Sequence, residues 1–456
     1  MKRFFCVFWI ILFALSVCIG LVACDSTSDN PGDKSEDELV FWCNSGYLAD
    51  FEQRLAEFTK QTGIKVRVEG IQANSWGELA QQVSTSAYSG SLPDCGDIAS
   101  EAMAALVAAD LIVPIDEYLE RDRTEIQDSL DEINPILLNA HTYDGKNYSL
   151  PTTWNNMCLY YNKNVLRSAG ISESDANYPH DGWTIENFLY CCEKITANNT
   201  VSGTGNKYGY KIQNQYFLTI EPWLNAYGTS VLSSDWTNTD LDKQAAKNCF
   251  SMLYNMMNAS DVTKQYSPKF GGTAEYDLFY SNRLGFMGNG MPYVYNLSTG
   301  GFNNSKSNVS ALKDGYDVVS FPTVDGSVST TIGVGACPIF KTSKNKENAW
   351  KLSKFLSSKK FQDEYLTENV WAIPVCKSAA DILAQKDFFP NNGQLFYNSL
   401  KNATIIPAPT SYSAVELELR KWFGGYMAGT SGFTLDDSGK NSLSKLASTI
   451  RGFLSE

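Results

Sequence analysis

The stretch ELVFWCNSGYLADFEQRLAEFTKQTGIKVRVE, residues 38–69, determines the architecture that we expect for this chain. It begins with an apolar run that ends at Cys43, and a short polar segment beginning at Asn44 follows. Apolar residues then recur at helical spacing as far as Gly63, after which the residues alternate as they do in a strand. Strand, helix and strand in this order predict a parallel sheet covered by helices. In such a sheet the loops that face a ligand lie at the carboxyl ends of the strands.

The same alternation continues along the chain. We expect a helix over 79–88, a strand near 97–99 and an Ala-rich helix over 101–109. A second unit begins with an apolar strand over 157–161, and a further amphipathic helix lies between 345 and 360. The sequence shows no internal repeat and no phosphate-binding loop or dinucleotide fingerprint. These patterns predict an α/β fold built from more than one domain.

Composition excludes several classes of protein. The chain has 456 residues, of which 43% are hydrophobic, so it is long enough to bury a sizeable core. Its formal net charge of −13 argues against a nucleic-acid partner, because phosphate binding needs clustered Lys and Arg. Its two His residues, His141 and His180, cannot build a His-rich metal site or a set of His-based catalytic centres. We therefore predict no metal, no cofactor and no catalytic residues.

The N-terminus carries the pattern of an export signal. Residues 1–23 combine a basic start with an apolar run that is too short for a confident membrane-spanning helix. The tetrapeptide LVAC, which ends at Cys24, resembles a bacterial lipobox, in which the Cys is lipidated after cleavage. An ordinary signal peptide with a chance Cys is the alternative. Residues 24–38 follow as the lipidated Cys and a polar, flexible tether.

Eight Cys residues remain beyond the signal and the lipidation site. No two of them form a CxxC pair, although an exported protein could oxidise them. Cys43, Cys158 and Cys337 lie in apolar, strand-like runs, where a buried free thiol is the simpler interpretation. We expect mostly free thiols and assign no disulfide pairing.

A series of short motifs runs in one order from Leu39 to the C-terminus. Its members are 51–66, Pro93-Asp94, 111–118, 144–151, 160–163, Gly182-Trp183-Thr184, 343–350 and Ile373-Pro374. Together with the lipobox-like tetrapeptide, this order resembles the extracellular solute-binding proteins of ABC importers, specifically the maltose-binding-like group that captures sugars. The resemblance implies two α/β lobes joined by chain crossovers that form a hinge, with the ligand in the cleft between them.

Transferred onto this chain, the resemblance implies particular lobe boundaries. The first lobe takes residues 39–150 and 319–359, and the second lobe takes residues 153–318 and 360–456.

A sugar site needs flat aromatic rings for the C–H faces of the ligand and polar groups for its hydroxyls. The candidate stacking residues, each on an expected loop or strand end, are Trp76, Trp154, Trp223, Tyr293 and Trp371. The candidate hydrogen-bonding residues are Asn44, Ser100, Glu101, Asn155 and Asn289. A core position is the competing interpretation for any single Trp, and we expect Trp42, Trp183, Trp236, Trp350 and Trp422 to be mostly structural.

These expectations combine into one functional hypothesis. The protein is exported and lipid-anchored to the cell membrane, facing the extracellular or periplasmic side. As a monomer it captures a carbohydrate, an oligosaccharide in our expectation, and delivers it to the membrane subunits of an ABC permease. Seven lysines between Lys341 and Lys360 form either a solvated helix face or a docking patch for the permease.

Two alternatives stay open. An exported glycoside hydrolase also uses aromatics and carboxylates, but it needs two carboxylates on opposite sides of the scissile bond. Among our candidates only Glu101 is a carboxylate, so the sequence identifies no partner for it. A binding protein for a different solute, such as a polyamine or a peptide, is the second alternative.

Overall fold

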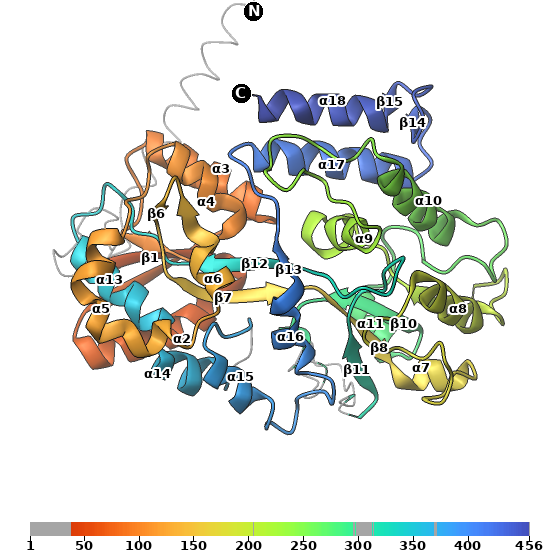
Figure 1. Ribbon diagram of the computed structural model, residues 1–456, viewed down its shortest axis with the longest axis horizontal. Helices are drawn as coiled ribbons and strands as arrows, with labels where there is room; N and C mark the ends of the chain where they lie inside the picture. Colours follow the sequence, from red (N-terminus) through yellow and green to blue (C-terminus); the bar gives the residue numbers. More distant parts are fainter. Residues whose placement is uncertain are drawn as a thin grey trace, which may run out of the picture. The chain divides into compact units, whose positions relative to one another are not determined.

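The computed structural model describes residues 38–203, 205–294, 297, 312, 314–368 and 372–455 (Figure 1). The chain divides into two units, Met1–Glu38 and Leu39–Glu456, and nearly all described residues belong to the second. The expected signal peptide, the lipidated Cys24 and almost all of the tether lie outside the described residues. In the described ranges no helix has the length and apolar character needed to cross a membrane.

Residues 38–69 form the predicted strand, helix and strand. These are β1 (Glu38–Asn44), α2 (Leu48–Thr62) and β2 (Lys65–Ile71). β1 lies in the middle of a three-stranded sheet, between β2 and β3 (Cys95–Gly96), and it pairs with β3 in parallel. The prediction of a parallel sheet at the start of the fold is therefore confirmed.

The spacing of apolar residues in α2 decides which face the helix buries. Phe51, Leu55 and Phe58 recur at every third or fourth position, and all three are buried in the same core as Phe41 of β1. The helix ends at Gly63, which has a φ of 75°. Glycine adopts this left-handed conformation without the steric penalty that a Cβ atom brings.

A second small core forms above this sheet. It contains residues of α3 (Trp76–Tyr88) and α4 (Ser100–Ala108) together with Ile98 of β4 (Ile98–Ala99). Ser75 is the N-cap of α3, because its hydroxyl accepts a hydrogen bond of 3.2 Å from the amide of Glu78. This capping fixes the start of α3 beside the loops at the carboxyl ends of the strands.

Two antiparallel strands connect the parts of the fold. β12 (Thr330–Ala336) pairs antiparallel with β7 (Pro151–Asn156) and with β4, and in parallel with β13 (Ala403–Ile405). Residues of β7 and β12 contribute to a further core, whose members run from Ile133 to Leu400. Figure 1 shows these strands running across the middle of the fold.

The other main sheet has the strand order β11-β8-β10-β9. Its bounds are β8 (Cys158–Asn162), β9 (Tyr208–Tyr210), β10 (Leu284–Asn289) and β11 (Tyr316–Val319). β8 pairs antiparallel with both β10 and β11, whereas β9 and β10 are parallel.

Besides α7 (Lys163–Ser168), which contributes Val165 and Leu166, five α-helices contribute to the core beside this sheet, which includes Trp183, Phe188 and Trp223. They are α8 (Ile185–Thr196), α9 (Glu221–Ala226), α10 (Gln244–Asn258), α17 (Tyr412–Met427) and α18 (Leu443–Leu454). Thr184 caps α8 with a capping box, as its position before the apolar run suggested.

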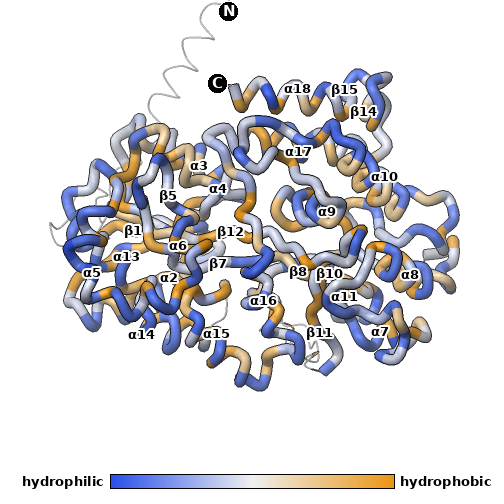
Figure 2. The backbone as a smooth tube through the Cα atoms, in the orientation of Figure 1, coloured by the Kyte–Doolittle hydropathy of each residue, from blue (hydrophilic) through white to orange (hydrophobic). Residues whose placement is uncertain are grey.

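Shorter elements and surface helices complete the described fold. They are α5 (Asp116–Leu130), α6 (Pro135–Leu138), β5 (Thr142–Tyr143), β6 (Lys146–Asn147), α7 (Lys163–Ser168), α11 (Glu275–Tyr280), α13 (Lys346–Ser357), α14 (Lys359–Phe361), α15 (Lys377–Leu383), α16 (Leu395–Asn398), β14 (Phe433–Thr434) and β15 (Asn441–Ser442). α5 is coloured mostly hydrophilic in Figure 2, and Ile126 is its buried residue.

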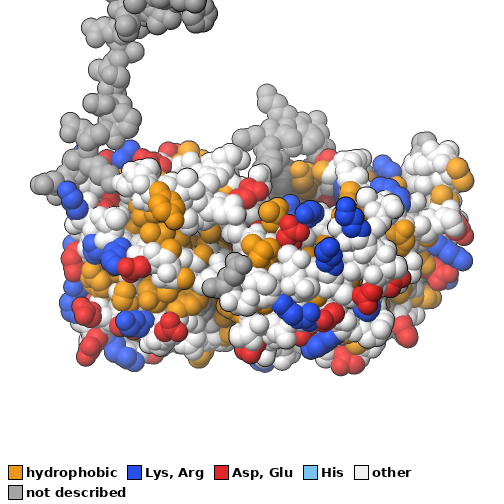
Figure 3. Space-filling model, turned by 90° about the horizontal axis from the view of Figure 1, so that it is seen from above, with side chains coloured by type: hydrophobic (Ala, Val, Ile, Leu, Met, Phe, Trp, Pro, Cys, Tyr) orange, Lys and Arg blue, Asp and Glu red, His pale blue; other side chains and the backbone are white. Residues whose placement is uncertain are grey.

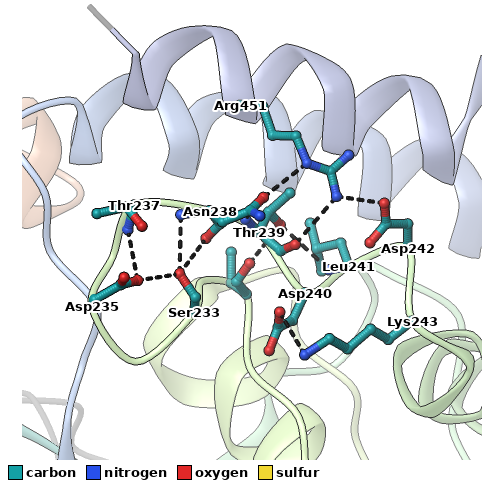
Figure 4. A network of polar contacts seen from close by, with 11 residues as sticks. Ser233, Asp235, Thr237, Asn238, Thr239, Asp240, Leu241, Asp242, Lys243 and Arg451 are labelled. Carbon is teal, nitrogen blue, oxygen red and sulfur yellow. Dashed lines mark hydrogen bonds and ion pairs between the residues drawn. The ribbon is translucent and has the colours of Figure 1, made fainter.

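The final helix is fastened to a loop by one arginine, as Figure 4 shows. Arg451 of α18 donates hydrogen bonds to the Asn238 side chain (2.8 Å) and to the Thr239 carbonyl (3.4 Å). Its guanidinium also pairs with Asp242. These contacts fix the loop between α9 and α10 against the C-terminal end of α18.

The packing of residues 319–330 indicates where the chain crosses between the two expected lobes. Val319 and Phe321 pack in the same core as Trp183, and β12 begins only at Thr330. The expected first-lobe segment 319–359 therefore begins with residues that pack beside the second lobe. We propose that the crossovers are β7 and β12.

Three of the seven lysines between 341 and 360, namely Lys341, Lys354 and Lys359, pair with acidic side chains. Lys354 lies 2.8 Å from Asp122, and Lys359 lies 3.0 Å from Glu132. For these three lysines the pairing favours a solvated, ion-paired surface over an open basic patch. Acidic and basic side chains are also interspersed on the face shown in Figure 3.

The eight Cys residues in the described part of the chain are buried free thiols, in agreement with the expectation from the sequence.

Candidate functional site

A cavity of about 350 Å³ lies where loops and helix ends from several parts of the fold meet. Its aromatic lining residues are Tyr47, Trp76, Tyr216, Phe217, Tyr293 and Tyr412. Its amide side chains are Asn44, Asn74, Asn155, Gln215 and Asn289. Glu101, Glu416 and Arg420 supply charged groups. The cavity therefore combines rings, amides and a few charges, as pockets for polar organic ligands do.

Asn44 stands at the carboxyl end of β1, at the position expected from the parallel sheet. Its side-chain nitrogen donates to the Ala73 carbonyl (2.8 Å), and its side-chain oxygen accepts from the Gly46 amide (2.9 Å). These bonds hold the loop after β1 against the segment that leads into α3. Trp76 is the first residue of α3, and this loop arrangement brings it to the same wall of the cavity.

Glu101 is a buried carboxyl group at the start of α4, with 4% of its surface exposed. Ser100 donates to its Oε2 (3.1 Å) and accepts from the amide of Val334 in β12 (3.2 Å). Ser100 thus lies behind Glu101 and is not among the residues that line the cavity. Burial raises the pKa of Glu101 to about 7, because the charged form loses solvation.

β7 and β10 supply the amide groups on another wall. The side-chain oxygen of Asn155 is buried and accepts no hydrogen bond from the described residues. Asn289 accepts from the Gly290 amide (3.0 Å), and the hydroxyl of Tyr160 donates to the Gly290 carbonyl (2.6 Å). These bonds fix the turn after β10, which presents Tyr293 to the cavity.

Two tyrosines from distant parts of the sequence stack at the cavity wall. The rings of Tyr216 and Tyr412 have centroids 5.5 Å apart and planes inclined by 13°. Burial raises the pKa of both hydroxyls well above the usual value, so both rings remain neutral.

α17 places a carboxylate and a guanidinium on the cavity. Glu416 accepts a hydrogen bond of 2.9 Å from the hydroxyl of Ser75, and its Oε1 lies 4.0 Å from Arg420. Arg420 in turn donates to the carbonyl of Asn214 (3.1 Å). Burial raises the pKa of Glu416, although the hydrogen bond from Ser75 acts in the opposite direction.

Two expected stacking residues are not at this cavity. Trp154 is 1% exposed, donates to the carbonyl of Pro374 (2.9 Å) and packs edge-on against Tyr397. Trp223 is fully buried among rings that include Phe188, with centroids 5.1 Å apart. Protein atoms cover both rings, so neither offers a face to a ligand. Both were expected to stack on the ligand, and we now assign both to the core. Trp371 lies outside the described residues.

One wall of the cavity consists of residues that were not predicted from the sequence. Tyr412, Glu416 and Arg420 are spaced by four residues, so they share one face of α17. This stripe of polar and aromatic residues beside the apolar Val415 and Leu419 was a usable signal. Tyr47, which lies three residues after Asn44, was a second signal in the sequence for a residue of the cavity. Glu416 also supplies a second carboxylate beside Glu101, which the glycoside-hydrolase alternative requires and which was not identified from the sequence.

No group of three or more potential metal ligands gathers in the part of the chain that the structure describes. The lining of the cavity offers hydrogen-bonding groups, ring faces and three ionisable side chains.

Comparison with known proteins identifies the class. The sequence model of the bacterial extracellular solute-binding proteins matches residues 45–363. The chain therefore belongs to the family of bacterial extracellular solute-binding proteins.

Individual relatives agree with this assignment. A protein of Brucella abortus (strain 2308), described only as a binding protein, is 26% identical over 391 residues, which cover 81% of this chain and 86% of the relative. A galactooligosaccharide-binding protein of Bacillus subtilis (strain 168) is 22% identical over 388 residues, covering 82% of this chain and 81% of the relative.

Solved structures with the same fold include two ligand complexes. One is an ABC substrate-binding protein of Listeria monocytogenes in complex with cycloalternan, with a TM-score of 0.72 and 18% identity over 92% of this chain and 98% of that chain. The other is a solute-binding protein of Thermotoga lettingae bound with alpha-D-tagatose, with a TM-score of 0.73 and 18% identity over 92% of this chain and 100% of that chain. The two-lobed fold is thereby confirmed. The family and the matched structures are binding proteins of ABC transporters, not enzymes.

Proposed function

We propose that this protein is the lipid-anchored substrate-binding component of an ABC importer, and that it captures an oligosaccharide in the cavity described above. The observation that carries the proposal is the composition of the cavity wall. Aromatic rings such as Trp76 and Tyr293 offer flat apolar faces, and the amides beside them offer donors and acceptors. A carbohydrate presents the complementary C–H faces and hydroxyl edges.

The charged residues favour a neutral polar ligand over a polyamine. Glu101 and Glu416 are both carboxyl groups, which a cationic ligand would need. Arg420 lines the same cavity and lies 4.0 Å from Glu416, so a positive charge already occupies this part of the wall. A hydroxyl group can donate a hydrogen bond to a carboxylate and accept one from a guanidinium.

Anchoring and delivery rest on the sequence and on the family. The tetrapeptide that ends at Cys24 supports lipidation, and the polar residues up to Glu38 support a flexible tether. Membership of an extracellular solute-binding family supports export and a permease partner. In this proposal the two lobes close over the sugar, and the closed form is the one that the permease recognises.

A thermal-shift screen tests the choice of ligand. The protein without residues 1–24 is heated with maltotriose, a galactobiose, an arabinobiose, spermidine or a tripeptide. A ligand that binds only the folded state stabilises it by about 2.7 kcal/mol when present at a hundredfold excess over Kd. We expect the melting temperature to rise with an oligosaccharide and to stay constant with spermidine and the peptide.

Two results would contradict the proposal. A shift with spermidine alone would assign the cavity to polyamines. Shortened sugar products after incubation would indicate hydrolysis by the two carboxyl groups.

A further inference from the structure

The cavity wall includes a direct contact between helices that belong to different cores. Leu79 of α3 packs in the small core that contains Ile98. Leu419 of α17 packs in the large core that contains Trp183. The start of α3 nevertheless touches the first half of α17, so this contact joins the two cores directly.

Two hydrogen bonds make the contact. The hydroxyl of Ser75 donates to Oε2 of Glu416 at 2.9 Å, and the hydroxyl of Ser413 donates to the carbonyl of Gly77, also at 2.9 Å. Because Ser75 caps α3, Glu416 places its carboxylate at the N-terminal end of that helix. The exposed amides and the macrodipole at a helix N-terminus favour an anion at this place.

The closeness of this approach depends on a glycine. A Cβ atom at Gly77 would lie 2.7 Å from Oε2 of Glu416 and 3.3 Å from the Cα atom of Ser413. Any larger residue would therefore push the two helices apart or displace the carboxylate. The absence of a side chain at this position is what allows the contact.

Glu416 has a second role at the same place. While its Oε2 binds the first turn of α3, its Oε1 lies near Arg420 on the cavity wall. The side chain thus touches both the opposite lobe and the space that a ligand occupies.

We propose that Glu416 is a positioning residue that latches α17 to the start of α3 and so holds a bound solute in the cavity. The identity of the solute rests on the function proposed above, whereas the two hydrogen bonds of the latch are observed within the chain itself. Opening the cleft must break the bonds of Ser75 and Ser413, so these bonds slow the release of the solute. Ser75 also lines the cavity, whereas Gly77 is not among the lining residues, so a change at Gly77 separates the latch from a direct contact with the solute.

The first test measures release of the oligosaccharide that binds most tightly in the screen. We expect Ser75→Ala to raise its dissociation rate roughly tenfold with little change in association, because a hydrogen bond to a charged group is lost. Gly77→Ala should act in the same direction without removing a polar group. Gly452→Ala in α18 is the matched control, since its Cβ would meet no atom within 4 Å. An unchanged dissociation rate in Ser75→Ala would overturn the proposal, even if Glu416→Ala released the sugar faster.

The second test needs no solute and so separates the latch from the proposed function. The melting temperatures of Ser75→Ala, Glu416→Ala and the double variant form a cycle. We expect the melting temperature of the double variant to fall by less than the sum of the two single decreases, because both substitutions remove the same hydrogen bond. Strictly additive losses would show that the bond does not form, whatever solute the protein binds.

Discussion

Glu101 shows how burial sets the chemistry of a single residue. Its carboxyl group is 4% exposed and receives one side-chain hydrogen bond, from Ser100. This bond does not offset the loss of solvation, so the pKa rises to about 7. Near neutral pH the group is therefore divided between a carboxylic acid that donates a hydrogen bond and a carboxylate that only accepts.

This pKa predicts how stability depends on pH. The folded state binds the proton of Glu101 more tightly than the unfolded chain does, so the free energy of unfolding is highest below the unfolded pKa. It should fall by roughly 3 kcal/mol as the pH rises through 7. Glu101→Gln cannot ionise, so it should lose less stability than the wild type between pH 4.5 and pH 8. Urea unfolding at both pH values measures the difference, and equal losses in the two proteins would refute the assignment.

Trp76 and Trp154 should respond to the same substitution in different ways. Trp154→Ala removes a buried ring and should lower the free energy of unfolding by about 3–5 kcal/mol. Trp76→Ala removes a partly exposed ring from the cavity and should weaken oligosaccharide binding about tenfold, or 1.4 kcal/mol. Denaturant unfolding and titration calorimetry on both variants separate the two effects. A large loss of stability in Trp76→Ala with unchanged affinity would exclude Trp76 from the site.

At the scale of elements, α17 combines two functions on two faces. Val415 and Leu419 anchor it in the large core. The adjoining stripe of Tyr412, Glu416 and Arg420 builds one wall of the cavity, and Tyr412 packs in the same core as Val415 and Leu419. Because the core holds the helix in place, the backbone positions of the stripe are fixed relative to the core.

Two glycines should show opposite effects when they are changed to alanine. Gly63 ends α2 with a φ of 75°, so Gly63→Ala forces a Cβ into a left-handed conformation and should destabilise the protein by about 1 kcal/mol. Gly452 lies inside α18 with open space around it, so Gly452→Ala should stabilise the protein by about 0.5 kcal/mol. Urea unfolding of both variants measures the signs. If both variants changed the free energy of unfolding in the same direction, the backbone at Gly63 or at Gly452 would differ from the conformation described here.

At the scale of the whole molecule, the described fold is several cores joined by β7 and β12. Each core is built from segments that are far apart in the sequence, and the cavity lies where the cores meet. A site of this kind exists only when the cores are correctly placed against one another. Contacts between them, such as the one between Ser75 and Glu416, therefore matter for the site as much as the residues that line it.

The sequence by itself determined the elements and the positions at their ends. Apolar spacing predicted β1, α2 and β2, and the rule that ligands bind at the carboxyl ends of parallel strands selected Asn44 and Glu101, which line the cavity. Local patterns succeed here because hydrogen bonds and side-chain direction within one element depend on neighbouring residues.

Only the tertiary structure decided which rings face the cavity and which are buried. Trp154 and Trp76 both follow a turn in the sequence, yet the first is covered by the segment around Pro374 and the second lies at the open start of α3. Glu416 reaches the cavity from a helix 315 residues after Glu101, a distance along the chain that no local pattern spans. The physical reason is that burial depends on what packs against a residue, and that is settled when the separate cores come together.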